Sequence, residues 1–164
     1  MLKRRCEVIL VSAYSAAKDI LLLEPDGVLF SNGPGDPKVM TKTVECCKEL
    51  LEYDLPVLGV CLGHQVIAHA LGGMTQKLKF GHHGANHAVT DVINRKTIIT
   101  SQNHGFTVSE LPKGSRQWFI NQIDGTNEGL KHDDMPVMSV QFHPEAGPGP
   151  LDAGYLFDEF VKKL

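Results

Sequence analysis

One uncharged stretch in the middle of the chain constrains the fold more than any other feature. Residues 55–76 contain no Asp, Glu, Lys or Arg. Within them a short apolar run over residues 57–60 stops at Cys61, and apolar residues at helical spacing follow until Gly72-Gly73. Pro56 and four glycines argue against a membrane span here. The stretch therefore predicts a buried strand that turns directly into a helix, as is typical of α/β proteins.

The same alternation of short apolar runs and amphipathic stretches extends over the first two thirds of the chain. It predicts an α/β fold with a mainly parallel sheet and helices on both faces. After about residue 74 the runs become strand-like and predict an antiparallel extension. The expected strands span residues 7–11, 27–31, 57–60, 75–80, 87–93, 97–101 and 135–142, and the expected helices span residues 15–23, 39–51 and 151–164, besides the helix after Cys61. Because no linker or repeat interrupts the pattern, we expect residues 1–164 to form one domain.

The charges of the chain are close to balanced. Its 164 residues include 16 basic and 19 acidic side chains, which gives a net charge of −3. No basic block is longer than residues 3–5, so the electrostatic footprint of a nucleic-acid-binding protein is missing from the sequence. The same basic residues and the apolar stretch after them imitate a signal peptide, but Glu7 interrupts that pattern. We expect neither a nucleic acid nor a membrane as a partner.

Four cysteines occur, at positions 6, 46, 47 and 61, and their spacing contains no CxxC pair. This usage is expected for a protein of a reducing compartment, so we expect a cytoplasmic location. We interpret Cys6 as strand packing and Cys47 as part of a helix core, and we leave Cys46 unassigned.

Cys61 has the setting of a nucleophile. Gly59 and Gly63 flank it in a G-x-C-x-G pattern, the thiol counterpart of the strand-turn-helix pattern G-x-S-x-G. We expect the glycines to allow a sharp turn, and the helix N-terminus to lower the pKa of the thiol. The turn also leaves the backbone amide of Leu62 free to donate to a developing oxyanion. A small buried hydrophobe is the alternative role of such a cysteine.

The candidate base is His143, which directly follows an expected buried strand. Pro144 favours an extended backbone at His143, and residues i and i+2 of an extended segment point to the same side. The carboxylate of Glu145 is therefore expected to lie near the imidazole and to orient it. An H-x-E pair alone is common, and here it gains weight from the cysteine pattern.

The remaining histidines do not predict a metal site. His64 and His69 are five residues apart, about 140° round a helix, so they do not share a ligand position as an i, i+4 pair does. His82, His83 and His87 lie in a glycine-rich connection without a carboxylate or thiolate nearby in sequence. We expect them to be hydrogen-bonded loop residues and expect no metal.

Four short runs carry a family resemblance. They are residues 31–37 (SNGPGDP), 59–65 (GVCLGHQ), 102–106 (QNHGF) and 141–145 (QFHPE). Together they resemble class I glutamine amidotransferases and, more narrowly, the glutaminase domain of the carbamoyl-phosphate synthetase small subunit. The cysteine and His-Pro-Glu runs are shared across that class. Residues 102–106, with residues 79–84 (KFGHHG) and 148–150 (PGP), are more typical of the carbamoyl-phosphate branch.

The resemblance implies a flavodoxin-like fold and hydrolysis of L-glutamine to glutamate and ammonia. Cys61 would attack the side-chain amide, His143 would act as base and then as acid, Glu145 would orient His143, and water would hydrolyse the resulting thioester. The ammonia would pass to a large synthetase subunit, which uses ATP and bicarbonate to form carbamoyl phosphate for pyrimidine and arginine synthesis. No cofactor is expected in this domain.

The resemblance also implies which residues hold glutamine. The oxyanion donors would be the backbone amides of Leu62 and Gly35. The full set of implied substrate-binding residues is Gly33, Gly35, Leu62, Gln65, Asn103, Gly105 and Phe106. The glycines of residues 33–35 allow a backbone amide to approach a substrate closely. Taken without the family, residues 102–106 fit a polar turn equally well.

The chain departs from the family at its start. Family members normally have a first strand, most of a first helix and a further N-terminal domain before the position of Met1, so residues 1–8 resemble the end of that helix running into the second strand. This leaves other readings open: a catalytically weak regulatory or partner-binding remnant, or the glutaminase of another synthetase such as anthranilate or GMP synthase. A cysteine hydrolase acting on another amide or ester is disfavoured by residues 33–37 and 103–106.

Overall fold

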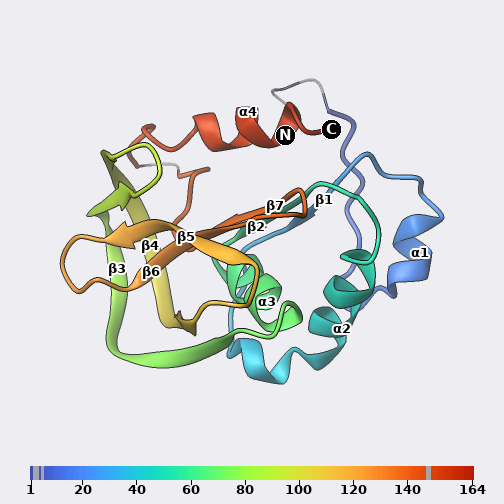
Figure 1. Cartoon of the computed structure of the whole chain (residues 1–164), viewed down its shortest axis with the longest axis horizontal. Coiled ribbons are helices and arrows are strands. Elements are labelled where there is room, and N and C mark those ends of the chain that lie inside the picture. Colours follow the sequence, from blue (N-terminus) through green and yellow to red (C-terminus); the bar gives the residue numbers. More distant parts are fainter. Residues whose placement is uncertain (2–3, 5, 147–148) are drawn as a thin grey trace.

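A computed structural model of the chain describes residues 1, 4, 6–146 and 149–164 (Figure 1). Three features of the sequence fall partly outside the described residues. They are the helix end expected at the start of the chain, the basic run over residues 3–5, and the motif over residues 148–150.

The described residues form a seven-stranded sheet in the order β1-β2-β7-β6-β5-β3-β4. Its strands are β1 (Val28–Phe30), β2 (Val57–Val60), β3 (Met74–Asp91), β4 (Lys96–Glu110), β5 (Ser115–Asn121), β6 (Asn127–His132) and β7 (Val137–Val140). Strands β1, β2 and β7 pair in parallel, and the other neighbours pair antiparallel. The antiparallel part therefore supplies more of the sheet than the mainly parallel arrangement that the sequence predicts.

Helices cover both faces of the sheet (Figure 1). They are α1 (Ala17–Leu21), α2 (Thr41–Leu50), α3 (Leu62–Ala70) and α4 (Tyr155–Val161), with a 3₁₀ turn, η2, at Pro37–Val39. On one face, Leu156 of α4 packs in a core with Phe119 and Phe142. On the other face, Ile67 of α3 packs with Leu130. The α/β class and the helices on both faces are confirmed, and each helix lies within its predicted range or the uncharged stretch.

The strands after residue 74 are longer than predicted. The expected strands at 75–80 and 87–93 merge into β3, and the expected strand at 97–101 extends to residue 110 in β4. The predicted glycine-rich connection around His82 and the possible polar turn at residues 102–106 are therefore wrong, because β3 and β4 pair along both segments through register shifts. Strands β5 and β6 are not predicted, because polar residues interrupt their apolar patterns.

The predicted strand over residues 7–11 is not formed. Its apolar side chains are exposed, with Leu10 92% accessible. Strand β1 pairs only with β2 among the described residues, so the segment has no neighbouring strand. An apolar run becomes a strand only where a partner completes its hydrogen bonds, and Cys6 therefore lies in no strand. Cys46 and Cys47 are both buried in α2.

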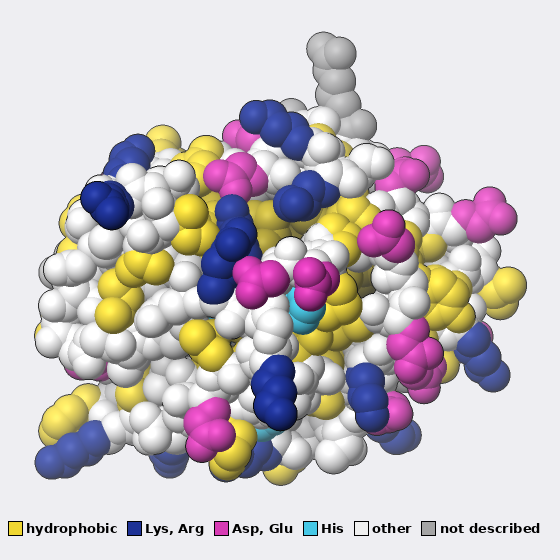
Figure 2. Space-filling model, viewed as in Figure 1, with side chains coloured by type: hydrophobic (Ala, Val, Ile, Leu, Met, Phe, Trp, Pro, Cys, Tyr) yellow, Lys and Arg dark blue, Asp and Glu magenta, His cyan; other side chains and the backbone are white. Residues whose placement is uncertain are grey.

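The surface in Figure 2 carries basic and acidic side chains interspersed over the visible face. In the described part of the chain, no helix combines the length and the apolar character that a bilayer crossing requires. The uncharged stretch instead divides between β2, α3 and the start of β3.

The junction between β2 and α3 depends on two close approaches. A Cβ atom added to Gly63 would lie 2.0 Å from the carbonyl oxygen of Phe30, and one added to Gly59 would lie 2.6 Å from Cδ1 of Ile67. The glycines therefore let α3 lie directly against the sheet. The turn itself is made by Cys61, which adopts a φ of 53°. This differs from the prediction that the glycines supply the turn.

We expect Gly63→Ala to lower the free energy of unfolding by about 2–3 kcal/mol, as in other overpacked sites, because the new methyl group collides with backbone that cannot move aside. Urea unfolding followed by circular dichroism measures this change. Gly105→Ala is the control: no atom lies within 4 Å of its added Cβ, so its stability should change by less than about 0.5 kcal/mol. Equal effects of both substitutions would contradict the proposed role of Gly63.

Candidate active site

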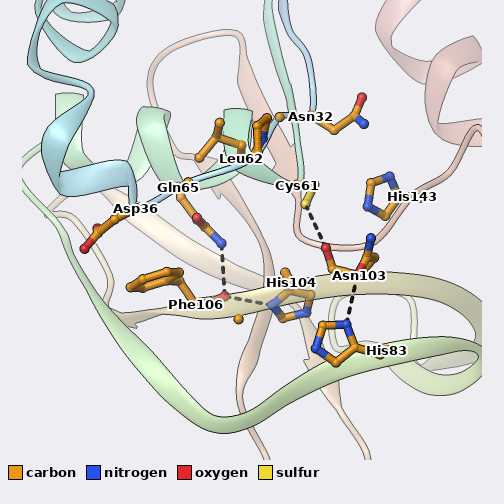
Figure 3. Close-up of a pocket in the computed structure, with 14 residues that line it drawn as sticks. Asn32, Asp36, Cys61, Leu62, Gln65, His83, Asn103, His104, Phe106 and His143 are labelled. Atoms are coloured by element: carbon orange, nitrogen blue, oxygen red, sulfur yellow. Dashed lines mark hydrogen bonds between the residues drawn. The ribbon is translucent and has the colours of Figure 1, made fainter.

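Three neighbouring parallel strands bring the predicted site residues to one edge of the sheet. The loop over residues 31–37 follows β1, Cys61 follows β2, and His143 follows β7 after two intervening residues. Because β1, β2 and β7 are adjacent and parallel, their carboxyl ends lie side by side. Ligands commonly bind at this edge of an α/β sheet. The antiparallel strand β4 supplies the opposite wall, through residues 103–106 (Figure 3).

Cys61 is held in a backbone conformation that is rare for a residue with a side chain. It caps the N-terminus of α3 with φ 53° and ψ −102°, and its amide donates to the carbonyl oxygen of Val140 in β7 at 2.9 Å. The residue is 5% exposed, and its sulfur lies 4.0 Å from the carbonyl oxygen of Asn103. Strained residues of this kind cluster at functional sites. The turn presents the thiol to a pocket beside the first residue of a helix.

His143 and Glu145 form the pair that their spacing predicts. Nδ1 of His143 donates to Oε1 of Glu145 at 2.8 Å, and the amide of His143 donates to the carbonyl oxygen of Ser101 at 2.9 Å. The other ring nitrogen, Nε2, is buried and has no hydrogen-bond partner among the described residues. Figure 3 shows the ring in the same pocket as Cys61. The imidazole is thus oriented through Nδ1, while Nε2 keeps its capacity for a further hydrogen bond.

The charge of His143 is set by these two neighbours. Interaction with the sulfur of Cys61 and then with the carboxylate of Glu145 raises the pKa of His143 from 6.5 to about 10, against the opposing effect of burial. The same contact lowers the pKa of Glu145. The imidazole therefore keeps its proton at neutral pH when the sulfur beside it is anionic.

A pocket of about 630 Å³ contains the thiol and the imidazole. All seven residues expected to hold a substrate line it, namely Gly33, Gly35, Leu62, Gln65, Asn103, Gly105 and Phe106. Glu145 does not line it and reaches it only through His143. Residues that were not predicted also line it, including Asn32, His83 and His104. Nδ1 of His83 donates to Oδ1 of Asn103 at 2.8 Å, and only the pairing of β3 with β4 shows that the two residues meet.

Two backbone amides beside the thiol are available to a ligand. Leu62 is the first residue of α3, and Gly35 has a φ of 109°, which a residue with a side chain rarely adopts. Within the described residues, neither amide donates to a protein acceptor. Gly33 lies close to this helix start, since an added Cβ would be 2.9 Å from Cδ2 of Leu62. The amides at a helix N-terminus favour an anionic group.

The wall beside Cys61 is fixed by a pair of buried glutamines. Nε2 of Gln65 donates to the carbonyl oxygen of Phe106 at 3.0 Å and to Oε1 of Gln141 at 2.9 Å. Nε2 of Gln141 in turn lies 3.8 Å from the sulfur of Cys61. With both amide hydrogens of Gln65 used by the protein, its Oε1 remains as an acceptor beside the pocket. Gln141 was not predicted, although it stands in the run that contains His143.

The histidines outside the pair separate into different environments. His64 is buried against Ser139, where desolvation lowers its pKa to about 3, and His69 lies 2.9 Å from Thr75. The two histidines do not face a common site, which confirms the prediction that they share no ligand position. His82 and His83 are consecutive in β3 but differ in their contacts: His83 lines the pocket, whereas His82 is buried between Glu128 and Asp124. The prediction that His82 is a loop residue is therefore wrong.

A flavodoxin-like sheet with a cysteine at the β2–α3 turn and a histidine–glutamate pair after β7 is the arrangement of a class of cysteine-dependent amidotransferases. The chain belongs to the class-I glutamine amidotransferase family, which matches residues 1–163.

Within that family, the chain is similar to one group of curated relatives. The carbamoyl phosphate synthase small chain of Clostridium perfringens is 50% identical over 160 residues, which cover 98% of this chain and 46% of the relative. The carbamoyl phosphate synthase pyrimidine-specific small chain of Bacillus subtilis is 48% identical over 163 residues, which cover 99% of this chain and 44% of the relative. The chain thus spans less than half the length of these relatives.

Solved structures share the fold at lower identity. A putative GMP synthase protein from Thermoplasma acidophilum has a TM-score of 0.80 at 21% identity, and the match covers 93% of this chain and 78% of that protein. A glutamine amidotransferase from Thermotoga maritima has a TM-score of 0.63 at 24% identity, and the match covers 82% of this chain and 64% of that protein. These likenesses confirm the predicted fold.

We expect Cys61→Ala to lower the pKa of His143 from about 10 toward 6.5, because the contact with Cys61 is the largest cause of the shift. Glu145→Gln should lower it by a smaller amount. The ring resonances of isotopically labelled histidine, followed by NMR against pH, measure both values. Since the pKa is raised by folding, the stabilisation from protonated His143 is complete below pH 6.5 and is lost as the pH rises to about 10. An unchanged His143 pKa in both variants would contradict this account.

Proposed function

We propose that the chain hydrolyses L-glutamine to glutamate and ammonia through a thioester on Cys61. The observation that carries the proposal is the arrangement at the β2–α3 turn, where the thiol shares a pocket with an imidazole whose far nitrogen is held by a carboxylate. Nucleophile, base and orienting group are the parts that covalent amide hydrolysis requires. Membership of the glutamine amidotransferase family supports glutamine as the amide.

In the proposed reaction His143 takes the proton of the Cys61 thiol through Nε2, the ring nitrogen that Glu145 leaves free. The raised pKa of His143 favours this transfer. The sulfur attacks the side-chain carbonyl carbon, and the negative charge that develops on its oxygen is stabilised by the amides of Leu62 and Gly35. The carbon–nitrogen bond then breaks as His143 gives its proton to the leaving nitrogen, which departs as ammonia.

The second half of the proposed reaction frees Cys61 again. Water attacks the thioester carbonyl and gives a proton to the neutral His143, while the carbon–sulfur bond breaks to release glutamate. Glu145 holds Nδ1 of His143 throughout, so the same nitrogen, Nε2, handles the proton in both halves. Each step uses groups of this chain, the substrate and water.

The substrate would be held by both walls of the pocket. On the side of the sheet edge, Gly33, Gly35 and Leu62 surround the amide carbonyl. On the β4 side, Asn103, Gly105 and Phe106 offer an amide side chain and backbone groups. The acceptor Oε1 of Gln65 lies between these walls and suits an ammonium or amide donor.

The proposed destination of the ammonia is the large subunit of a carbamoyl-phosphate synthetase, which would consume ATP and bicarbonate. Relatives named carbamoyl phosphate synthase small chain, at up to 50% identity over 98% of this chain, support that partner. The anthranilate and GMP synthase alternatives have less support, because the likeness to the putative GMP synthase protein, at 21% identity, concerns the fold alone. We also propose a cytoplasmic location, because the four cysteines are free, as is usual in a reducing compartment.

We expect the purified chain to release ammonia from glutamine and Cys61→Ser to lower that rate at least about 1,000-fold, because the alcohol is a far weaker nucleophile than the thiolate. A coupled glutamate dehydrogenase assay measures ammonia. Cys6→Ser is the matched control, since Cys6 lies outside the pocket, and it should retain the rate. Unchanged release by Cys61→Ser would reject Cys61 as nucleophile. A folded wild-type chain that is inactive with and without a synthetase large subunit would favour a binding remnant.

A second substitution tests the wall beside the thiol. We expect Gln65→Glu to raise the KM for glutamine about 10-fold to 100-fold, the cost of leaving buried acceptors unpaired, because a carboxylate would face Phe106 O and Gln141 Oε1 without hydrogens to donate. The kcat should change less. Gln76→Glu, at an exposed position of β3, is the control and should leave both constants unchanged. A KM unaffected by Gln65→Glu would remove Gln65 from the binding site.

A further inference from the structure

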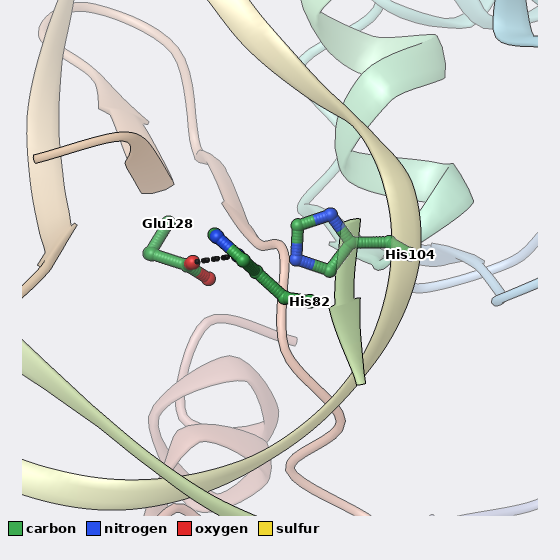
Figure 4. Close-up of side chains that lie close together, drawn as sticks. All are labelled: His82, His104 and Glu128. Atoms are coloured by element: carbon green, nitrogen blue, oxygen red, sulfur yellow. Dashed lines mark ion pairs between the residues drawn. The ribbon is translucent and has the colours of Figure 1, made fainter. Parts of the chain in front are cut away.

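A second cluster of chemically reactive side chains lies behind the β4 wall of the pocket. It consists of His82 from β3, His104 from β4 and Glu128 from β6 (Figure 4). One ligand-type atom from each lies within 4.8 Å of the others, and the three residues are 8%, 6% and 0% exposed. Gln102 adds a fourth polar group, because its Oε1 is 3.1 Å from Nδ1 of His82 and 2.8 Å from Nε2 of His104.

Each imidazole of the cluster is anchored through its other nitrogen. Nε2 of His82 lies 2.9 Å from a carboxylate oxygen of Asp124, and Nδ1 of His104 lies 2.7 Å from the carbonyl oxygen of Phe106. Both of these oxygens accept hydrogen bonds, so both anchored nitrogens carry a hydrogen. When the inward nitrogen carries no proton, as in a ring that binds a metal ion, its lone pair points into the cluster. Carboxylate and carbonyl anchors of this kind are the usual partners of metal-ligating histidines.

Hydrogen bonds alone do not satisfy the cluster. If Oε1 of Gln102 faces Nε2 of His104, both atoms are acceptors and neither brings a hydrogen to the contact. If the amide is turned round, its NH₂ group faces Nδ1 of His82, which must carry a hydrogen because it lies 3.2 Å from the Glu128 carboxylate. In one orientation of the Gln102 amide two acceptors therefore face each other, and in the other orientation two donors do, unless His104 also carries two protons.

The carboxylate of Glu128 points to the same conclusion independently. Its Oε1 accepts from Nδ2 of Asn121 at 3.0 Å, but its Oε2 is buried without a hydrogen-bond partner among the described residues. An unpaired carboxylate oxygen in a fully buried residue is costly, and it is a good ligand for a cation. Figure 4 shows the carboxylate directed toward the ring of His82, with His104 on the far side.

We propose that His82, His104 and Glu128 bind a divalent transition-metal ion of the zinc class, with Gln102 as a fourth, neutral ligand. Two imidazoles and one carboxylate form a donor set that zinc commonly accepts. Ligand atoms around a tetrahedral zinc ion are about 3.3 Å apart. The three ligand atoms of the cluster, which lie within 4.8 Å of one another, would therefore move together by up to about 1.5 Å. Coordination would release the proton on Nδ1 of His82 to solvent, use the lone pair of each inward nitrogen and leave both anchoring hydrogen bonds in place.

The proposed ion would support the pocket wall from behind. The carbonyl oxygen of Phe106 accepts from His104 and also from Gln65, and His104 itself lines the pocket, so the cluster adjoins the pocket directly. The bound ion would cross-link β3, β4 and β6, because each of these strands supplies one ligand. This role is independent of the proposed chemistry at Cys61, and either can fail without the other.

The test uses the whole chain with Cys61→Ser, so that the thiol in the pocket cannot bind the probe. Cobalt(II) is titrated into this protein, and the visible absorption of the bound ion gives its affinity. We expect binding without thiolate charge-transfer bands, displacement of cobalt by zinc, and a metal-dependent rise in Tm. No binding at 1 mM cobalt would overturn the proposal.

Glu128→Gln, added to Cys61→Ser, assigns the ligands. We expect it to weaken cobalt binding at least tenfold, and His83→Gln, the matched control one residue from His82, to leave the affinity unchanged. Equal affinity in the Glu128→Gln protein, or a loss in the His83→Gln protein, would overturn the assignment. Should Glu128→Gln fail to fold, NMR of the protein that carries only Cys61→Ser provides the test. We expect cobalt to shift the ring protons of His82 and His104 more than those of His132. The reverse order would reject the site.

Discussion

The closeness of α3 to the sheet is the constraint on which the rest of the site depends. Gly63 has no Cβ atom to hold the helix away from the carbonyl oxygen of Phe30, so the chain can leave β2 and enter α3 with only one residue between them. That residue, Cys61, absorbs the whole change of direction in a left-handed conformation. Packing energy from Ile67 and its neighbours on the buried face of α3 stabilises this geometry.

Once the turn is fixed, the order of the strands in the sheet determines which other residues meet at the site. Strands β1, β2 and β7 are neighbours, so the glycine loop, the thiol and the imidazole come from distant parts of the chain yet meet at one edge. The antiparallel strand β4 then closes the pocket with residues that do not belong to that edge. Because β1, β2 and β7 position the nucleophile and β4 forms the opposite wall, a change in the contacts that β4 makes need not move the nucleophile.

Much of this arrangement could be predicted from local patterns. The uncharged run around Cys61 indicates a buried strand and helix, and the two-residue spacing of His143 and Glu145 indicates their contact. What could not be predicted depends on pairing between distant strands. Gln141 meets Gln65 only because β7 lies beside β2. Glu128 lies in β6, whose polar and glycine residues hide the strand pattern, so no carboxylate could be assigned to His82. The apolar run at residues 7–11 gave the opposite error, because composition alone does not provide a partner strand.

The two consecutive histidines of β3 have a consequence for how this segment can change. His83 belongs to the pocket and His82 to the buried cluster, since successive side chains of a strand project to opposite sides. A one-residue insertion or deletion just before them, if absorbed by slippage of the strand, would exchange their surroundings and disturb both places together. Length variation in β3 is therefore tolerable only outside this dipeptide, or where a bulge restores the alternation before it is reached.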